Sequence, residues 1–180
     1  MVIGEAVELL EDAVPAGAGG TWMDAGAGDG TFTLALARIL GPDAHIFAVD
    51  RDKGALRELE QRAARDRNRP GITTLTADFT GSFELPEARP LDGMLFANSL
   101  HYVRDPRIVL ARLVKWLRPG GQVVFVEYDR RPANPWVPYP IDADKLPALC
   151  VSVGLTDPVK TSTRPSEYGG ELYVALATIR

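Results

Sequence analysis

Short apolar blocks alternate with amphipathic segments along most of the chain. Five blocks have the length and near-continuous apolar character of buried strands: residues 21–25, 44–50, 72–77, 93–97 and 122–128. Helix-like patterns lie between several of them, at residues 31–40, at 52–65 and from Asp105–Pro106 onward. Regular alternation of strands and helices predicts an α/β fold, in which a doubly wound, mostly parallel sheet is covered on both faces.

The two ends of the chain extend this pattern. Residues 3–10 predict a short helix and residues 15–20 a linker, whereas residues 144–153 predict a last helix that ends at Gly154. Two strands follow, at about 156–165 and 171–179. We therefore expect a single domain over residues 1–180, with residues 1–19 as its N-terminal helix and linker.

The helix that opens at Asp105–Pro106 has the preferred order of a cap residue followed by proline. We expect it to stop at Arg118–Gly121, where proline and two glycines interrupt the pattern. Its expected apolar face comprises Ile108, Val109, Leu113, Val114 and Leu117.

A glycine-rich loop joins the first strand to the helix at 31–40. Gly26, Gly28 and Gly30 occupy alternate positions of this loop. Glycine permits positive φ and removes Cβ atoms that would hold a ligand away, and a helix N-terminus attracts polar ligands. The loop therefore predicts a site for an adenosine-containing cofactor.

Acidic residues indicate which cofactor the loop binds. Asp50 ends the next strand about twenty residues later, the position of a carboxylate that holds ribose hydroxyls. The third glycine comes one residue too early for a dinucleotide fingerprint. A pyrophosphate beside Asp29 and Asp24 would meet like-charge repulsion on the order of 1–4 kcal/mol. A sulfonium cation would instead be attracted.

Composition excludes several other classes of protein. A chain of 180 residues with 46% hydrophobic and 24% charged residues is typical of a globular domain. Its net charge of −4 does not favour a nucleic acid as partner. No apolar run is long enough to span a membrane, and residues 1–11 have no basic leader, so we expect a cytoplasmic protein. The lone cysteine, Cys150, provides no metal cluster, and we expect it to pack beside Leu146 and Val153.

Five motifs, in order and spacing, resemble those of class I S-adenosylmethionine-dependent methyltransferases: Asp24–Gly30, Asp50, Thr76–Phe79, Asn98–Pro106 and Arg118–Gly121. The resemblance covers roughly Gly20 to Arg180. It is closest to the small-molecule branch that includes the ubiquinone and menaquinone biosynthesis methyltransferases. It implies a seven-stranded Rossmann-like sheet whose last strand is antiparallel.

The resemblance also implies contacts with S-adenosylmethionine. The backbone of Gly26, Gly28 and Gly30 would lie against its methionine and ribose parts, and Asp24 would reach its amino group. The remaining implied contacts are Asp50 with the ribose, Asp78 and the Phe79 amide with the adenine, and Asn98 with the methionine chain. Arg51 departs from the pattern, because many relatives place an apolar residue against the adenine face there; a guanidinium can also stack on it.

Methyl transfer needs an aligned acceptor and, for a phenol, hydroxyl or protonated amine, a base near it. His101, Tyr102 and Glu127 follow or end strands at the edge of the sheet where such a group must lie. His101 is the preferred base because its ordinary pKa suits neutral pH. The alternative for His101 and Tyr102 is that they pack over the cofactor or cap the following helix, and Glu127 could pair with Arg130 or Arg131.

The acceptor is expected to be a small, flat or apolar molecule. Residues 130–140 carry four prolines together with Trp136 and Tyr139, and we expect the two aromatic side chains to form one wall of the acceptor pocket. The alternative is a rigid surface connection with both aromatics packed on the core. Because this segment is short, either the acceptor is large or another subunit, such as a second copy in a homo-oligomer, covers the site.

Two other functions compete with methyl transfer. A dinucleotide-dependent oxidoreductase of the short-chain type would need Tyr-x-x-x-Lys, and none of the five tyrosines has lysine four residues later. A catalytically silent S-adenosylmethionine-binding domain or subunit would keep the same binding motifs, so the sequence leaves this alternative open.

Overall fold

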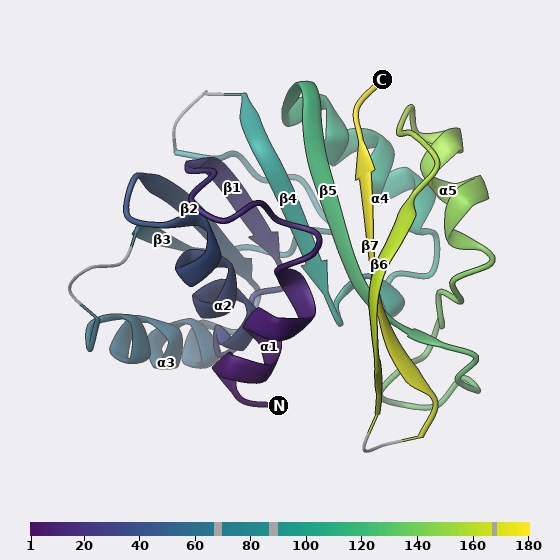
Figure 1. Cartoon of the computed structure of the whole chain (residues 1–180), viewed down its shortest axis with the longest axis horizontal. Helices are drawn as coiled ribbons and strands as arrows, with labels where there is room; N and C mark the ends of the chain where they lie inside the picture. The colour runs from purple at the N-terminus through teal and green to yellow at the C-terminus, as the bar shows by residue number, and fades with distance from the viewer. Residues whose placement is uncertain (67–69, 87–89, 167–168) are drawn as a thin grey trace.

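Seven strands form one sheet with the order β3-β2-β1-β4-β5-β7-β6 (Figure 1). The computed structural model describes residues 1–66, 70–86, 90–166 and 169–180. The strands are β1 (Gly20–Ala25), β2 (Ala44–Asp50), β3 (Gly71–Thr76), β4 (Leu91–Ala97), β5 (Leu117–Asp129), β6 (Val159–Pro165) and β7 (Glu171–Thr178). β7 pairs antiparallel with β5 and β6, and the other pairs are parallel. The predicted fold class is confirmed, including the antiparallel last strand.

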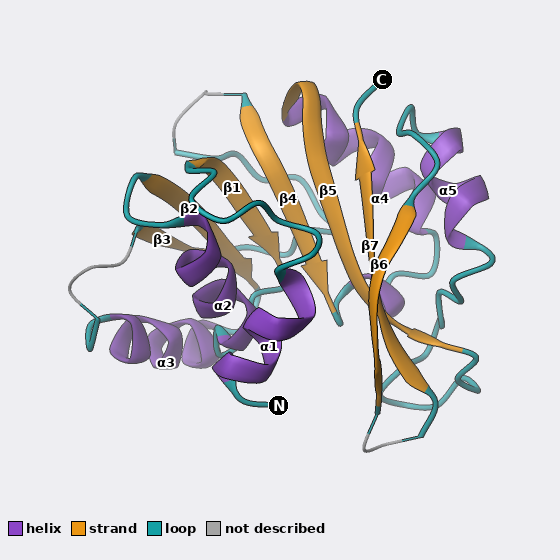
Figure 2. Cartoon of the chain, viewed as in Figure 1, coloured by secondary structure: helices purple, strands orange, loops and turns teal. Residues whose placement is uncertain are grey.

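The described residues form five α-helices and two 3₁₀ turns, of which α1 precedes β1 and the others lie between strands (Figure 2). The helices are α1 (Ile3–Leu10), α2 (Thr31–Leu40), α3 (Lys53–Ala63), α4 (Pro106–Leu113) and α5 (Leu146–Ser152), and the turns are η1 (Leu100–Tyr102) and η2 (Val114–Trp116). β1 pairs with β2 on one side and with β4 on the other, so the direction of strand succession reverses between β1 and β4. Ligands of open α/β sheets bind at the carboxyl ends of the strands at such a reversal.

The period-two pattern of the strands gives the sheet two apolar faces. Met23 and Phe96 belong to a core cluster with side chains of α4 and α5, whereas their neighbours Trp22 and Leu95 belong to a cluster with α1 and α2. Successive side chains of a strand point to opposite faces, so each strand contributes to both clusters. Figure 2 shows α1 and α2 on one side of the sheet and α4 and α5 on the other. Cys150 is fully buried in the first cluster, with Leu146 in the same cluster and Val153 packed against it.

The helix at Pro106 ends earlier than the sequence pattern indicated. α4 stops at Leu113, η2 follows, and Leu117 already pairs with Leu91 as the first residue of β5. The next paired residues are Gly93 and Gln122, so Arg118–Gly121 is an irregularity inside β5 rather than a helix stop. Ile108 is 65% exposed, so its place on the apolar face was also wrong.

The Asp105–Pro106 boundary is observed, although the Asp105 side chain makes no capping hydrogen bond. The Ile3–Leu10 helix has the predicted bounds. The predicted strand at 156–165 begins only at Val159, and the predicted helix at 144–153 is shortened to α5. These differences lie at the ends of elements, where local sequence patterns are least informative.

Gly30 fixes the approach of the glycine loop to α3. Its φ is +86°, and a Cβ built on it would lie 2.1 Å from Cδ1 and 2.9 Å from Cγ of the buried Leu59. The loop and α3 can pack this closely only because position 30 has no side chain.

We expect Gly30→Ala to lower the free energy of unfolding by about 1–3 kcal/mol more than Gly17→Ala does, because the new methyl group overpacks against Leu59. Gly17 also has positive φ, +70°, but a Cβ there would meet nothing within 4 Å. Urea unfolding of both variants separates overpacking from backbone strain. Equal losses would show that the contact with Leu59 is not the constraint.

Candidate functional site

Three cavities adjoin at the carboxyl ends of β1, β2 and β4, and Asn98 lines all three. The first has a volume of about 320 Å³ and extends from Asp24 to β6. The second, of about 480 Å³, lies along the ends of β2 and β3. The third, of about 520 Å³, lies beside η1 and residues 130–140. The reversal of strand order between β1 and β4 thus coincides with a site that consists of three adjoining cavities.

The glycine loop has the conformation that its sequence predicted. Gly26 and Gly28 have φ values of +85° and +54°, and both line the first and second cavities. The Gly28 N–H donates to Asp50 Oδ2 at 2.8 Å, which ties the loop to the end of β2. A Cβ on Gly26 would lie 2.5 Å from the Ser99 Cβ. Only a glycine lets the loop pass this close to the segment after β4.

Asp24 is the most deeply buried acidic side chain of the first cavity. Its residue is 1% exposed, and its Oδ2 accepts a 2.6 Å hydrogen bond from the Thr33 hydroxyl. Its Oδ1 has no hydrogen-bond partner within the described part of the chain, and the same holds for Asn98 Oδ1 and Ser99 Oγ. Buried polar atoms are nearly always paired in native proteins, so three unpaired atoms around one site point to a polar ligand.

Burial raises the pKa of the Asp24 carboxyl from 3.8 to about 7. The Thr33 hydrogen bond lowers the pKa, and the nearby Asp50 charge raises it further. A cation placed against Oδ1 would therefore find a carboxylate whose charge is otherwise poorly compensated.

Asn98, which lines all three cavities, has an unusual backbone conformation. It is one of two non-glycine residues with positive φ within the described ranges, at φ 52°, and its N–H donates to Val126 O at 2.8 Å. Non-glycine residues in this conformation are uncommon and gather at functional sites. The strained turn brings the Asn98 side chain to the junction of the cavities.

Besides Gly26, Gly28 and Asn98, the second cavity brings together four more of the predicted cofactor residues: Asp50, Arg51, Asp78 and Phe79. Besides Gly28, Asp50 accepts from the Asp52 N–H through Oδ1 at 2.8 Å. Thr80 donates to Asp78 Oδ1 through its hydroxyl at 2.7 Å and through its N–H at 2.9 Å. The hydrogen bond from the hydroxyl is the main cause that lowers the pKa of Asp78 below its ordinary value. Both carboxylates are thus held in fixed positions by backbone and hydroxyl donors.

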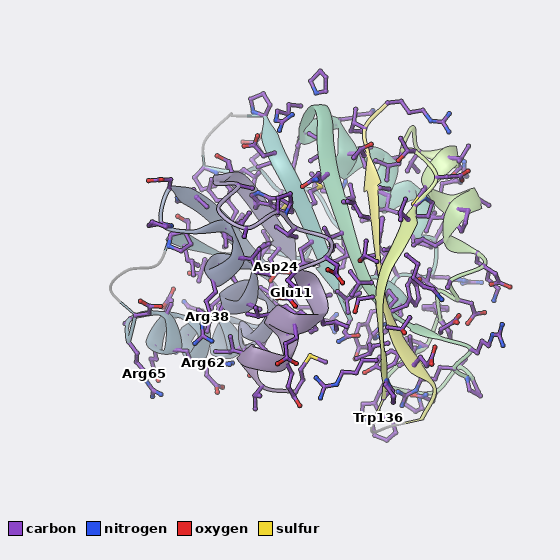
Figure 3. All side chains as sticks on the ribbon, in the orientation of Figure 1. Glu11, Asp24, Arg38, Arg62, Arg65 and Trp136 are labelled. Atoms are coloured by element: carbon purple, nitrogen blue, oxygen red, sulfur yellow. The ribbon has the colours of Figure 1, made fainter. Side chains whose placement is uncertain are left out.

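The charge argument made for Asp29 from the sequence was incomplete. Arg62 of α3 forms a 2.8 Å ion pair with Asp29 and also donates to the Asp29 carbonyl and the Thr31 hydroxyl. The charge of Asp29 is therefore largely compensated, and the buried Asp24 remains as the acidic group that favours a cation. Figure 3 shows Arg62 on α3, away from Asp24 at the centre of the sheet.

Aromatic side chains line much of the third cavity, and the complete lining is Asn98, His101, Tyr102, Tyr128, Arg131, Trp136 and Val137. Trp136 is 73% exposed (Figure 3). Tyr139 is absent from this lining; its N–H donates to the His101 carbonyl at 3.0 Å and holds the segment in place. The structure therefore separates the two aromatics that the sequence grouped together.

His101, which lines this cavity, forms a buried pair with Glu127. Their residues are 2% and 0% exposed, and His101 Nδ1 lies 2.6 Å from Glu127 Oε2. Glu127 Oε1 accepts from the N–H groups of Leu100 and His101 at 3.0 and 3.2 Å. Glu127 thus accepts hydrogen bonds from η1 inside the protein, and its side chain has no exposed surface for direct contact with an acceptor.

Several residues of the site were not identified from the sequence. Ser99 and Thr80 line the second cavity, Glu5 and Arg164 line the first from elements distant from the glycine loop, and Thr33 donates to the cavity residue Asp24. Ser99 and Thr80 follow predicted ligands directly, so their positions carried a signal. Within the described ranges, no group of three His, Cys, Asp or Glu side chains could hold a metal ion, and no described helix is long and apolar enough to cross a membrane.

Asp24→Asn is expected to raise the thermal stability of the protein at pH 8 and to leave it nearly unchanged at pH 4. The folded state holds the Asp24 proton up to about pH 7, whereas the unfolded chain releases it near 3.8, so wild-type stability falls as pH rises between these values. Each kcal/mol gained should raise Tm by roughly 2–4 °C in a chain of this size. Circular dichroism at several pH values measures the difference, with Asp43→Asn, at an exposed position, as control. A Tm difference independent of pH would contradict the assigned cause.

Comparison with known proteins identifies the family. The family described as "Methyltransferase domain" matches residues 23–123, more than half of the chain and the part that carries the glycine loop, Asp50, Asp78 and Asn98. The chain is similar to phosphoethanolamine N-methyltransferase 1 of Zea mays, with 32% identity over 117 residues, 63% of this chain and 22% of the relative. It is 33% identical over 116 residues to the demethylmenaquinone methyltransferase of Clavibacter sepedonicus, 64% of this chain and 44% of the relative. The chain thus spans less than half the length of these curated relatives.

Solved structures show the same fold. The 1,6-didemethyltoxoflavin-N1-methyltransferase of Burkholderia thailandensis, solved with bound 1,6-didemethyltoxoflavin and S-adenosylhomocysteine, has a TM-score of 0.75 and 23% identity. The similarity covers 98% of this chain and 77% of that one. The family resemblance inferred from the motifs is therefore confirmed, and the chain belongs to the methyltransferase domain family.

Proposed function

We propose that the chain is an S-adenosylmethionine-dependent methyltransferase that moves a methyl group to a small acceptor molecule. The observation that carries this proposal is the unpaired Asp24 Oδ1 in a cavity that meets two others at Asn98. The first cavity is thus suited to a cation, the second to a nucleoside and the third to an acceptor.

The residues present fit the cofactor. Asp50, at the end of β2, would accept from ribose hydroxyls, and Asp78 with the Phe79 amide would hold the adenine in the second cavity. Arg51 lines the same cavity, where its guanidinium would stack on the ring. Asp24 and Asn98 Oδ1 would accept from the ammonium group, with the backbone of Gly26 and Gly28 alongside. Gly30 supports the loop from the side of α3.

S-adenosylmethionine supplies a methyl group bonded to a positively charged sulfur, which is a good leaving group. The protein has to hold an acceptor in line with that bond, and alignment of this kind contributes roughly 7 to 11 kcal/mol in favourable cases. Asn98 stands where the first two cavities meet the third, so an acceptor in the third cavity would lie beside the junction. Positioning is the main catalytic contribution that this geometry supports.

The buried pair supports His101 as a base toward an acceptor hydroxyl or ammonium. A carboxylate accepts hydrogen bonds, so the His101 tautomer with its ring proton on Nδ1 would donate to Glu127 Oε2 and leave the lone pair of Nε2 for this proton transfer. We assign Glu127 a positioning role rather than contact with the acceptor. Tyr102 is 50% exposed and lines both the second and third cavities, a position suited to contact with the acceptor.

A flat or apolar small molecule is the acceptor that fits the third cavity best. Tyr102, Tyr128 and Trp136 provide aromatic surface, and the Arg131 guanidinium lies 4.6 Å from the centre of the Tyr128 ring. The two relatives named above are methyltransferases of phosphoethanolamine and demethylmenaquinone, both small molecules. A catalytically silent binding domain would bind the cofactor and methylate none of the acceptors in a screen with a labelled methyl donor.

Calorimetric titration with S-adenosylmethionine, S-adenosylhomocysteine and NAD tests the cofactor assignment. We expect both sulfur compounds to bind and NAD to bind far more weakly, because the buried Asp24 side chain disfavours a pyrophosphate beside it. Tighter binding of NAD would instead support the dinucleotide-dependent oxidoreductase.

Asp50→Ala should weaken binding of S-adenosylhomocysteine at least about tenfold, since hydrogen bonds to a charged group contribute roughly 1.5–3 kcal/mol each. Asp43→Ala removes an equal charge at an exposed position before β2 and should leave the affinity unchanged. The same titration measures both variants. An Asp50→Ala protein that binds as tightly as wild type would remove Asp50 from the site.

Trp136→Ala should raise the KM for the acceptor about tenfold or more, equivalent to about 1.4 kcal/mol, and leave cofactor affinity unchanged. The physical reason is the loss of apolar contact area in the third cavity. Tyr139→Ala is the matched control, because Tyr139 belongs to the same segment but not to the cavity lining. Initial rates with the first acceptor found by screening measure the effect. A larger effect of Tyr139→Ala would contradict this assignment of the cavity wall.

A further inference from the structure

Arg164 is the cationic side chain among the lining residues of the first cavity. It lies on β6, at the edge of the sheet, whereas Asp24 lies on β1 in its middle. Strands β4, β5 and β7 separate the two in the strand order, so Arg164 enters the cavity from the other side. Its side chain is 35% exposed and pairs with Glu5 of α1 through Nη2.

The first cavity therefore has walls of opposite character. Asp24 Oδ1 and Asn98 Oδ1 are unpaired acceptors on one side, and Arg164 is a donor with a fixed positive charge on the other. Acceptors suit an ammonium group, and a guanidinium suits a carboxylate. A ligand that satisfies both walls carries an ammonium and a carboxylate, as the methionine part of S-adenosylmethionine does.

The hydrogen bond to Glu5 engages only part of the N–H groups of the Arg164 guanidinium. A guanidinium has five N–H groups, and Glu5 Oε1 accepts from Nη2. The other oxygen of Glu5, Oε2, accepts from the Val2 N–H at 2.9 Å and caps α1. Glu5 thus connects the start of α1 to Arg164 and orients the guanidinium beside the cavity.

We propose that Arg164 binds the α-carboxylate of the cofactor's methionine part while Asp24 binds its α-ammonium group. This inference rests on the proposed function and adds a specificity: the site selects cofactors that keep the carboxylate. The interaction is a charge-assisted hydrogen bond across the cavity, and no bond is made or broken. Arg164 acts on binding and has no part in proton transfer.

Decarboxylated S-adenosylmethionine is the direct probe, because it lacks the carboxylate and keeps the adenosine, the sulfonium and the ammonium group. Calorimetry gives its affinity and that of S-adenosylmethionine for wild type, Arg164→Gln and Arg164→Lys. We expect wild type to prefer the carboxylated compound at least tenfold, Arg164→Gln to lose this preference, and Arg164→Lys to retain part of it. Lys160→Gln removes a cation from the same strand outside the cavity lining and should keep the full preference.

The outcomes separate this inference from the proposed function. If wild type binds S-adenosylmethionine and Arg164→Gln keeps the full preference, Arg164 does not bind the carboxylate, whereas the proposed function stands. If Arg164→Gln weakens both compounds equally, Arg164 is a structural residue and the inference is overturned. If wild type binds neither compound, both proposals fail.

Discussion

A carboxylate buried at the end of β1 with one oxygen left unpaired is the constraint on which the site depends. Burial raises the pKa of Asp24 to about 7, so the fold maintains a group that would be more stable in water or beside a cation. The Thr33 hydroxyl stabilises one oxygen, and the other has no hydrogen-bond partner within the described residues, while Asp24 itself lines the first cavity. An arrangement that lowers stability and is kept at the topological switch point of the sheet is best explained by ligand binding.

The rest of the site is arranged around this carboxylate by tight backbone packing. The loop reaches α3 because Gly30 has no side chain, and it reaches the turn after β4 because Gly26 has none. Asp50 then receives the Gly28 N–H, which joins the ends of β1 and β2. Asn98, in its strained conformation, closes the junction from β4. These contacts give three cavities that share one residue, the geometry needed to hold a nucleoside, a charged chain and an acceptor side by side.

Charged residues outside the loop adjust what the site accepts. Arg62 compensates Asp29, so the acidity of the first cavity is concentrated at the buried Asp24. Arg164 provides the opposite charge from β6, and the buried Glu127 fixes the orientation of His101 beside the third cavity. Each of these residues comes from an element far from the glycine loop in the sequence.

The sequence by itself determined the alternation of elements, the glycine loop and the place of Asp50, because these depend on local hydrophobic periods and on short spacings. It also identified the family from five ordered motifs. The tertiary structure alone decided that Arg62 meets Asp29, that Glu127 meets His101 and that Arg164 meets Glu5, across 33, 26 and 159 residues. It also showed Ile108 exposed and Tyr139 outside the third cavity. Such contacts follow from strand order and register, which bring distant residues together and which a local pattern does not encode.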